Sequence, residues 1–300
     1  MAGKDQALVS ARWLKERMGE PSFKQNFRVL DATWHLAMFK RDFIKEHREK
    51  RIPGAKFFDL AECRDKNTDL LMMLPKPEEF AKYIQKLAGI ENHHHVVLYD
   101  NHDNFVVFSA ARAWWMFHVF GHAKVSVLEG GLPSWIKEGY EIASGDYNKE
   151  EEYPAATSEY KPRYREELVK DFDFVKNNIT SRQYQVMDGR PKPRFLGSEE
   201  GPDPNIPSGH FPNEVNVMAM QFFDRGNRKI KSPEEIRSLM KKLGIDLDCP
   251  TMSLDGGSGV AASLLAFIAF LGGNGHETAL YDAGWSEWVA KAPELILTEK

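Results

Sequence analysis

The chain has 300 residues, of which 42% are hydrophobic and 28% charged, and its formal net charge is −4. This balance is typical of a folded globular protein and argues against nucleic acid as the main partner, since phosphate binding needs a clustered basic surface. No apolar run approaches the roughly 20 residues that cross a bilayer, so we expect no membrane partner. The N-terminal segment lacks the apolar core of a signal peptide. With two cysteines there is no disulfide framework, and we expect a cytoplasmic protein, with mitochondria as the alternative.

The first half of the chain is predicted to alternate short buried strands with helices. A strand in "VLDATW" (29–34) is followed by an amphipathic helix in "PEEFAKYIQKLAGI" (77–90). The next strand, "VVLYD" (96–100), leads into an apolar helix within "SAARAWWMFHVFGH" (109–122). A further strand opens "VLEGGLPSW" (127–135). This order predicts crossover connections and a parallel sheet that is covered on both faces.

A charged, proline-containing segment without apolar periodicity follows, and we predict that residues 143–166 form a linker. Within it, the run "KEEEY" (149–153) is interpreted as solvated. The three histidines at 93–95 are likewise predicted to lie in a solvated loop, because consecutive side chains cannot all face one metal ion. We therefore expect no metal site.

The second half repeats the first in the same order, at an offset of roughly 155 residues. The matches are "VMDGRP" (186–191), "PEEIRSLMKKLGI" (233–245), "TMSLD" (251–255) and "ALYDAGWSEW" (279–288). We predict an α/β protein of two duplicated domains, each an open, mainly parallel sheet with helices on both faces. The predicted boundaries are 7–142 and 167–297, on either side of the linker.

The stretch "TMSLDGGSGVAASLLAF" (251–267) predicts a buried strand, a tight glycine turn and the start of an apolar helix. Backbone N–H groups at such a helix N-terminus can bind an anion or stabilise a thiolate. The residue at the tip of the turn is Gly256, which offers no reactive side chain.

An ordered set of motifs makes the chain similar to a known family. The motifs are "RIPGAKFFDL" (51–60), "ARAWWMFHVFGHAKVSVLEGGLPSW" (111–135), "SGHFPNEVNV" (208–217), "KSPEEI" (231–236) and "YDAGWSEW" (281–288). With them the chain resembles the tandem rhodaneses, the thiosulfate and 3-mercaptopyruvate sulfurtransferases, from about residue 7 to residue 297. The resemblance implies two rhodanese-like domains, the first of them non-catalytic, and no cofactor.

The family's reaction is implied to run through a cysteine on the second-domain loop. Its thiolate takes sulfur from a small anionic donor as a persulfide, and a thiol acceptor or cyanide removes that sulfur. The family loop Cys-Gly-Ser-Gly-Val-Thr-Ala corresponds to residues 256–262 of the active-site-type loop 255–262, which places Gly256 at the nucleophile position. A persulfide cannot form on glycine. The resemblance assigns a catalytic position to Ser258 and substrate-binding positions to Gly257, Gly259, Val260 and Ala261.

Supporting groups of the family have also changed. The aspartate and histidine of the proposed charge relay fall on Ala61 and Met72, which leaves Ser258 without a base. Of the two substrate-binding arginines, the first is Arg194 and the second falls on Asp203, a reversal of charge.

The chain's two cysteines are candidates to replace the missing nucleophile. Cys63 lies in a segment that the family places near the domain interface, and it is the alternative nucleophile. Cys249 opens the strand before the loop and is predicted to be an ordinary buried cysteine.

Three functional hypotheses follow from these residues. The first is a pseudoenzyme of the sulfurtransferase family that keeps an anion-binding loop, with a small anionic sulfur donor or another anion as its partner. The second is a residual sulfurtransferase that moves sulfane sulfur to a thiol acceptor. The third is a protein-interaction module with an empty cleft.

Overall fold

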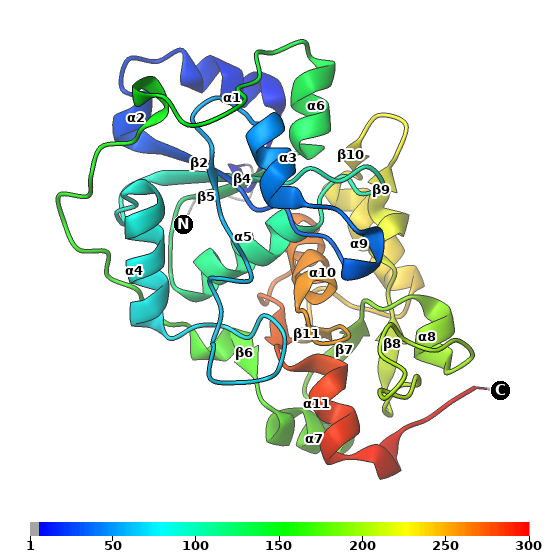
Figure 1. The fold of residues 1–300 in the computed structure, drawn as a ribbon. Helices are drawn as coiled ribbons and strands as arrows, with labels where there is room; N and C mark the ends of the chain where they lie inside the picture. The colour runs from blue at the N-terminus through cyan, green and yellow to red at the C-terminus, as the bar shows by residue number, and fades with distance from the viewer. Residues whose placement is uncertain (1–5, 300) are drawn as a thin grey trace. The chain divides into compact units, whose positions relative to one another are not determined.

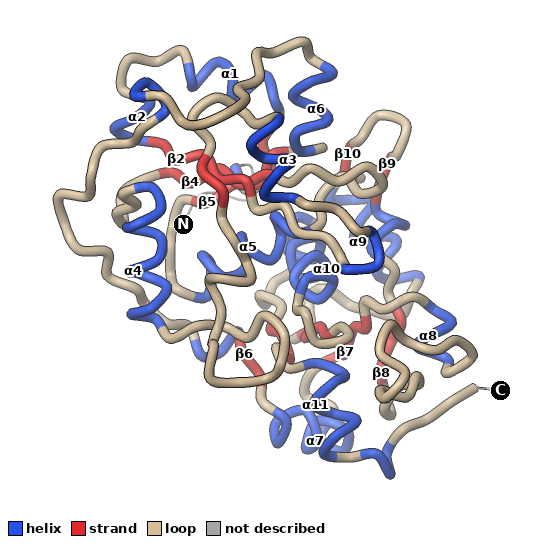
Figure 2. Tube along the Cα trace, viewed as in Figure 1, coloured by secondary structure: helices blue, strands red, loops and turns tan. Residues whose placement is uncertain are grey.

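The structure is a computed structural model that describes residues 6–299 and divides them into two compact units (Figure 1). Unit 1 and unit 2 are each built from three stretches of the chain. Unit 1 contains residues 6–64, 75–164 and 223–230, and unit 2 contains residues 65–74, 165–222 and 231–299. In each unit the strands are flanked by helices (Figure 2).

Unit 1 contains a five-stranded parallel sheet with the strand order β1-β5-β4-β2-β3. The strands are β1 (Leu8–Val9), β2 (Phe27–Asp31), β3 (Lys56–Phe57), β4 (His95–Tyr99) and β5 (Val125–Leu128). The helices are α1 (Ala11–Met18), α2 (Phe23–Asn26), α3 (Phe43–Glu49), α4 (Pro77–Ala88), α5 (Ser109–Val119) and α6 (Gly131–Lys137). All five residues of β4 are buried, as expected for a central strand covered on both faces.

The signals that start and stop helices explain several of these boundaries. Helix α4 begins at Pro77 with Glu78 and Glu79 in its first turn, and it ends before Gly89, which has a left-handed backbone. Helix α5 is buried along almost its whole length, in agreement with its continuous apolar sequence.

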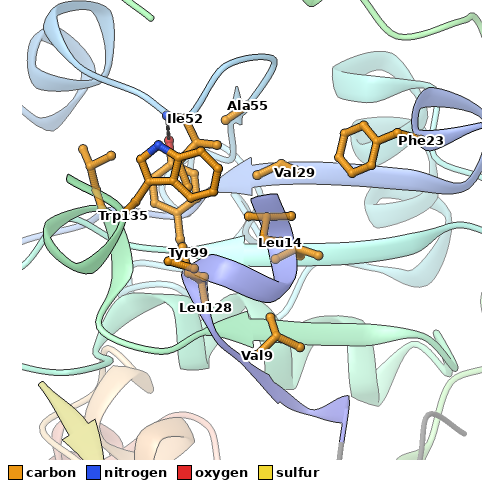
Figure 3. Close-up of a cluster of buried hydrophobic side chains, with 12 residues drawn as sticks. Val9, Leu14, Phe23, Val29, Ile52, Ala55, Tyr99, Leu128 and Trp135 are labelled. Carbon is orange, nitrogen blue, oxygen red and sulfur yellow. Dashed lines mark hydrogen bonds between the residues drawn. The ribbon is translucent and has the colours of Figure 1, made fainter. Parts of the chain in front are cut away.

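The core of unit 1 lies between its sheet and its helices. Figure 3 shows Val29, Leu128 and Trp135 among the side chains of this cluster, all of them fully buried. The hydroxyl of Tyr99 accepts a hydrogen bond from the backbone N–H of Ile52 at 3.4 Å. Burying the polar end of an aromatic ring in this way requires such a partner.

Unit 2 repeats the strand order of unit 1, as β6-β12-β11-β7-β8, with all pairs parallel. The strands are β6 (Val169–Lys170), β7 (Gln185–Asp188), β8 (Glu214–Asn216), β11 (Thr251–Leu254) and β12 (Ala279–Tyr281). The helices are α7 (Phe172–Ser181), α8 (Lys192–Leu196), α9 (Pro233–Lys242), α10 (Val260–Leu271) and α11 (Gly284–Lys291). The predicted duplicated α/β fold is confirmed.

Two segments belong to the unit that their position in the chain would not suggest. Residues 65–74 belong to unit 2, where the N–H of Leu74 donates to Asp282 at 2.9 Å. The antiparallel hairpin of β9 (Phe223–Asp224) and β10 (Lys229–Ile230) belongs to unit 1, where the N–H of Ile230 donates to Glu129 at 2.9 Å. The predicted boundaries at 7–142 and 167–297 stay a prediction, and neither of them anticipates these exchanged segments.

The segment predicted as a linker packs on unit 1 as far as residue 164. Arg51, 1% exposed, forms a buried ion pair with Glu151 at 2.8 Å, and the hydroxyl of Tyr153 accepts from the N–H of Val29 at 2.9 Å. The interpretation of 149–153 as a solvated run is therefore wrong at Glu151 and Tyr153. Glu151 and Tyr153 stand on either side of the exposed Glu152, and the charged character of the run gave no sign that these two side chains pack on unit 1.

The prediction of a solvated histidine loop is also wrong for two of its three residues. His94 and His95 are buried, and only His93 is exposed. His94 accepts a hydrogen bond from the N–H of Glu91 at 2.8 Å, and His95 pairs with the hydroxyl of Ser126 at 2.6 Å. Each imidazole is a satisfied core group rather than a metal ligand.

Candidate functional site: the loop between β11 and α10

The loop that joins β11 to α10 needs glycine at two positions. Gly257 has a φ of +124° and Gly259 a φ of +68°, and both values are in the region that side chains rarely adopt. A Cβ atom on Gly257 would also lie 2.8 Å from the hydroxyl oxygen of Ser286. These glycines turn the chain from the buried strand into the N-terminus of α10.

Gly256 differs from both of them. Its φ is not positive, and a Cβ added there would meet no heavy atom within 4 Å. Its carbonyl oxygen accepts a hydrogen bond from the hydroxyl of Ser286 at 2.5 Å. The backbone at the predicted nucleophile position could therefore carry a side chain, but this sequence supplies none.

The loop's amide groups converge on a carboxylate from the same loop. Oδ1 of Asp255 accepts from the N–H of Gly257 at 2.8 Å and of Gly259 at 3.0 Å. Oδ2 accepts from the N–H of Ala261 at 2.9 Å and, at a longer 3.4 Å, from that of Ala262. A carboxylate is favoured here because the first N–H groups of a helix have no partners inside the helix.

Ser258 completes this set of hydrogen bonds. Its hydroxyl donates to Oδ2 of Asp255 at 3.2 Å and accepts from the N–H of Val260 at 3.3 Å. The N–H groups at the four substrate-binding positions predicted within the loop, Gly257, Gly259, Val260 and Ala261, thus already have acceptors there. Their assignment to substrate stays a prediction.

Asp255 is the functional residue that the sequence reasoning missed. Its side chain is 4% exposed, and its own carbonyl accepts from the N–H of Trp285 at 2.9 Å. A signal was available in the repeat, because "VVLYD" and "TMSLD" both end in aspartate, at Asp100 and Asp255. Only the structure shows where the second carboxylate points.

The predicted arginine site is partly formed. Arg194 lies in α8 and is half-buried, and its Nε atom is buried without an acceptor among the described residues. Asp203, at the position of the family's second arginine, is exposed, and its carboxylate accepts from the N–H of Asn205 at 2.9 Å. Asp203 therefore stabilises its own turn.

The two cysteines differ in exposure. Cys63 is 3% exposed, while Cys249 is exposed, and neither forms a disulfide. The prediction that Cys249 is buried is wrong, because it lies in the turn before β11 rather than in the strand. Across residues 6–299 no group of three or more potential ligands could hold a metal ion. In the same range, no helix has the length and apolar character needed to cross a membrane.

Fold and loop together define a two-domain rhodanese-like protein, and comparisons with known proteins agree. A family model for the rhodanese-like domain matches residues 10–138. The human 3-mercaptopyruvate sulfurtransferase is 39% identical over 98% of this chain and 95% of its own length. The thiosulfate sulfurtransferase of Cricetulus griseus is 41% identical over 96% of this chain and 93% of its own length.

A solved structure gives the same result. The 3-mercaptopyruvate sulfurtransferase SseA from Escherichia coli superposes with a TM-score of 0.78 at 29% identity, covering 93% of this chain and 99% of its own. The chain belongs to the thiosulfate and 3-mercaptopyruvate sulfurtransferase family.

Proposed function

We propose that this chain is a catalytically impaired member of the sulfurtransferase family, in which the loop of unit 2 no longer forms a persulfide. The single observation that carries the proposal is Gly256 at the position of the nucleophile. The backbone conformation does not require glycine at this position, because there is room for a Cβ atom. The glycine therefore bears on the chemistry of the loop and not on its backbone geometry.

The missing step can be written out for thiosulfate. A cysteine thiolate would attack the outer sulfur, a new S–S bond would form, the S–S bond of the donor would break, and sulfite would leave with the electron pair. An acceptor thiol would then take the outer sulfur from the persulfide. Glycine offers no electron pair for the first attack, and the hydroxyl of Ser258 is already both donor and acceptor within the loop.

The loop nevertheless retains its capacity to bind an anion. Its N–H groups hold a carboxylate, that of Asp255. The family implies a small anionic sulfur donor or another anion and a thiol acceptor as partners. Any such anion would compete with Asp255 for the same N–H groups.

The alternative of residual sulfur transfer through Cys63 has less support. This thiol is 3% exposed, so a sulfur donor has little access to its sulfur atom. Cys249 is exposed but lies before β11, at the opposite end of that strand from the loop.

The proposal is tested by offering thiosulfate and 3-mercaptopyruvate to the protein, to Gly256→Cys and to Cys63→Ser/Cys249→Ser. Mass spectrometry measures the gain of one sulfur atom, and thiocyanate formation from cyanide measures turnover. We expect neither in the unaltered protein. In Gly256→Cys we expect weak sulfur uptake at residue 256, because Ala61, Met72 and Asp203 no longer support the reaction. Turnover that persists in the variant without cysteines would refute the proposal.

A further inference from the structure

We propose that the Asp255 carboxylate occupies the N–H groups of the loop of unit 2 and so prevents external anions, including anionic sulfur donors, from binding there. The inference accepts the family position of the loop given above, and it concerns binding rather than the loss of the thiol. It predicts that restoring a nucleophile alone would give weak sulfur uptake at most, because the donor would have to displace the Asp255 carboxylate in order to bind.

The first step concerns the number of loop N–H groups that are free to donate a hydrogen bond to an external anion. Three N–H groups of the loop donate to the Asp255 carboxylate at 2.8–3.0 Å, and that of Val260 donates to Ser258. Each N–H group has one hydrogen to donate. A sulfate or thiosulfate ion would have to displace the carboxylate to reach them. If the carboxylate remained, the ion would bring further negative charge against a buried group of the same sign.

The second step is that Asp255 has little freedom to withdraw. Its carbonyl oxygen accepts from the N–H of Trp285 at 2.9 Å. Gly284 approaches so closely that a Cβ atom there would lie 2.5 Å from this oxygen. The backbone of Asp255 is therefore held in place on one side while its side chain is held by the loop on the other.

The third step is the corresponding loop of unit 1. There Oδ2 of Asp100 accepts from the N–H groups of Phe108 at 2.8 Å and Ala110 at 2.9 Å, at the start of α5. The carbonyl of Asp100 accepts from the N–H of Leu132 at 2.9 Å, just as that of Asp255 accepts from Trp285. Unit 2 thus has the same arrangement as the loop of unit 1, in which an aspartate satisfies the helix N-terminus.

The experiment measures anion binding to the full chain by NMR and by thermal stability. Sulfate and thiosulfate are titrated at constant ionic strength, with chloride as the balancing salt. The backbone amide signals of Gly257, Gly259 and Ala261 are followed in the unaltered protein, Asp255→Asn and Asp255→Ala. Asp248→Asn is the matched control, because it removes the same charge from an exposed residue of unit 2.

In the unaltered protein and in Asp248→Asn we expect no saturable movement of these signals and no rise in Tm beyond that given by chloride. In Asp255→Ala we expect saturable shifts and a rise in Tm with either anion, since the N–H groups become available. In Asp255→Asn we expect weaker binding, because the amide oxygen can still accept from part of these N–H groups. Saturable binding to the loop of the unaltered protein overturns the inference. So does the absence of binding in folded Asp255→Ala. If neither variant folds, the titration of the unaltered protein decides alone.

The result is separable from the test of the proposed function. Sulfur transfer by the unaltered protein would refute the catalytic proposal, whereas anion binding at its loop would refute the role of Asp255. Either result can occur without the other.

Discussion

Asp255 and Gly256 are neighbours, and the two proposals above assign each of them an effect on a different part of sulfur transfer. Under the proposed function Gly256 lacks the atom that would attack the donor, and under the further inference the Asp255 carboxylate occupies the N–H groups that would hold it. The same amide geometry that stabilises a thiolate in the family also suits a carboxylate, because both are anions at a helix N-terminus. On these proposals the two residues affect the chemistry of the loop and leave the fold in place.

The buried histidines of unit 1 give the molecule a pH dependence. Burial lowers the pKa of His94, His95, His102 and His122 to about 4, because the charged imidazolium is poorly solvated inside the unit. Burial has the opposite effect on a carboxyl group and raises the pKa of Asp100 to about 6. The two kinds of group therefore act in opposite directions on stability.

We predict that stability falls as the pH is lowered from about 6.5 towards 4, and that His122→Gln makes this fall less steep. The unfolded chain binds protons on histidine near pH 6.5, while folded His122 does so only near 4. Within that window each such group costs up to about 1.4 kcal/mol per pH unit. Asp100 offsets part of this loss, since its native form gains a proton at higher pH than the unfolded form does.

The measurement is Tm against pH for the unaltered protein, His122→Gln and the control His93→Gln. His93 is 58% exposed, so its replacement should leave the slope unchanged. Equal slopes for all three proteins would show that His122 is not held neutral by burial.

At the scale of elements, α6 follows β5 and α11 follows β12, and each of these helices begins with a glycine that lies close to a backbone carbonyl group. Gly131 opens α6 with a φ of +57°, and Gly284 opens α11 with a φ of +58°. A Cβ atom would lie 2.0 Å from the carbonyl oxygen of Asp100 in the first case and 2.5 Å from that of Asp255 in the second. Both distances are far below a normal contact.

We predict that Gly284→Ala destabilises the protein more than Gly244→Ala does. Gly244 also has a positive φ, +88°, but a Cβ atom there would meet nothing within 4 Å. Gly244→Ala should cost about 1–2 kcal/mol through backbone strain alone. Gly284→Ala should cost about 1–3 kcal/mol more, because the backbone must also shift. Urea unfolding measures the difference, and equal losses would contradict the predicted overlap.

Elements with strong local signals were predictable from the sequence. Pro77 and the acids behind it define the start of α4, and Ser232 forms with Glu235 the capping box that starts α9. The strand–turn–helix at 251–267 was also predictable, as was the glycine turn within it, while the nucleophile position at Gly256 stays a prediction. The two-residue edge strands β1, β3 and β6 were not, because two residues are too short to show a period.

The rest of the site could not be derived from pattern. The direction of the Asp255 side chain depends on tertiary geometry, and an aspartate next to a glycine turn reads equally well as a turn residue. Burial of Glu151 and exposure of Cys249 both oppose the average behaviour of their residue types.

At the scale of the whole molecule, the segment after β5 is part of unit 1 rather than a free connection. Its attachment includes the Arg51–Glu151 ion pair and the Tyr153–Val29 hydrogen bond. The Arg51 guanidinium also donates to the carbonyl of Gly145 at 2.7 Å.

We predict that Glu151→Ala destabilises unit 1 by about 3 kcal/mol, because it leaves the buried Arg51 guanidinium without its counter-charge. The adjacent Glu152→Ala removes an exposed acid and should change stability by no more than about 0.5 kcal/mol. Urea unfolding gives the loss, and limited proteolysis should cut residues 143–164 faster in Glu151→Ala alone. Identical behaviour of the two variants would show that the ion pair does not hold the segment.

The exchange of residues 65–74 and 223–230 has a consequence for any attempt to dissect the protein. Dividing the chain once, near residue 164, would give two fragments that each lack a segment of their own unit. The first would lack the hairpin 223–230, which contacts Glu129, and the second would lack residues 65–74, which contact Asp282. Each unit keeps its own sheet but includes one segment from the other half of the chain. We therefore expect each fragment to be less stable alone than when the two fragments are mixed, and the mixture is the sample to compare with the full chain.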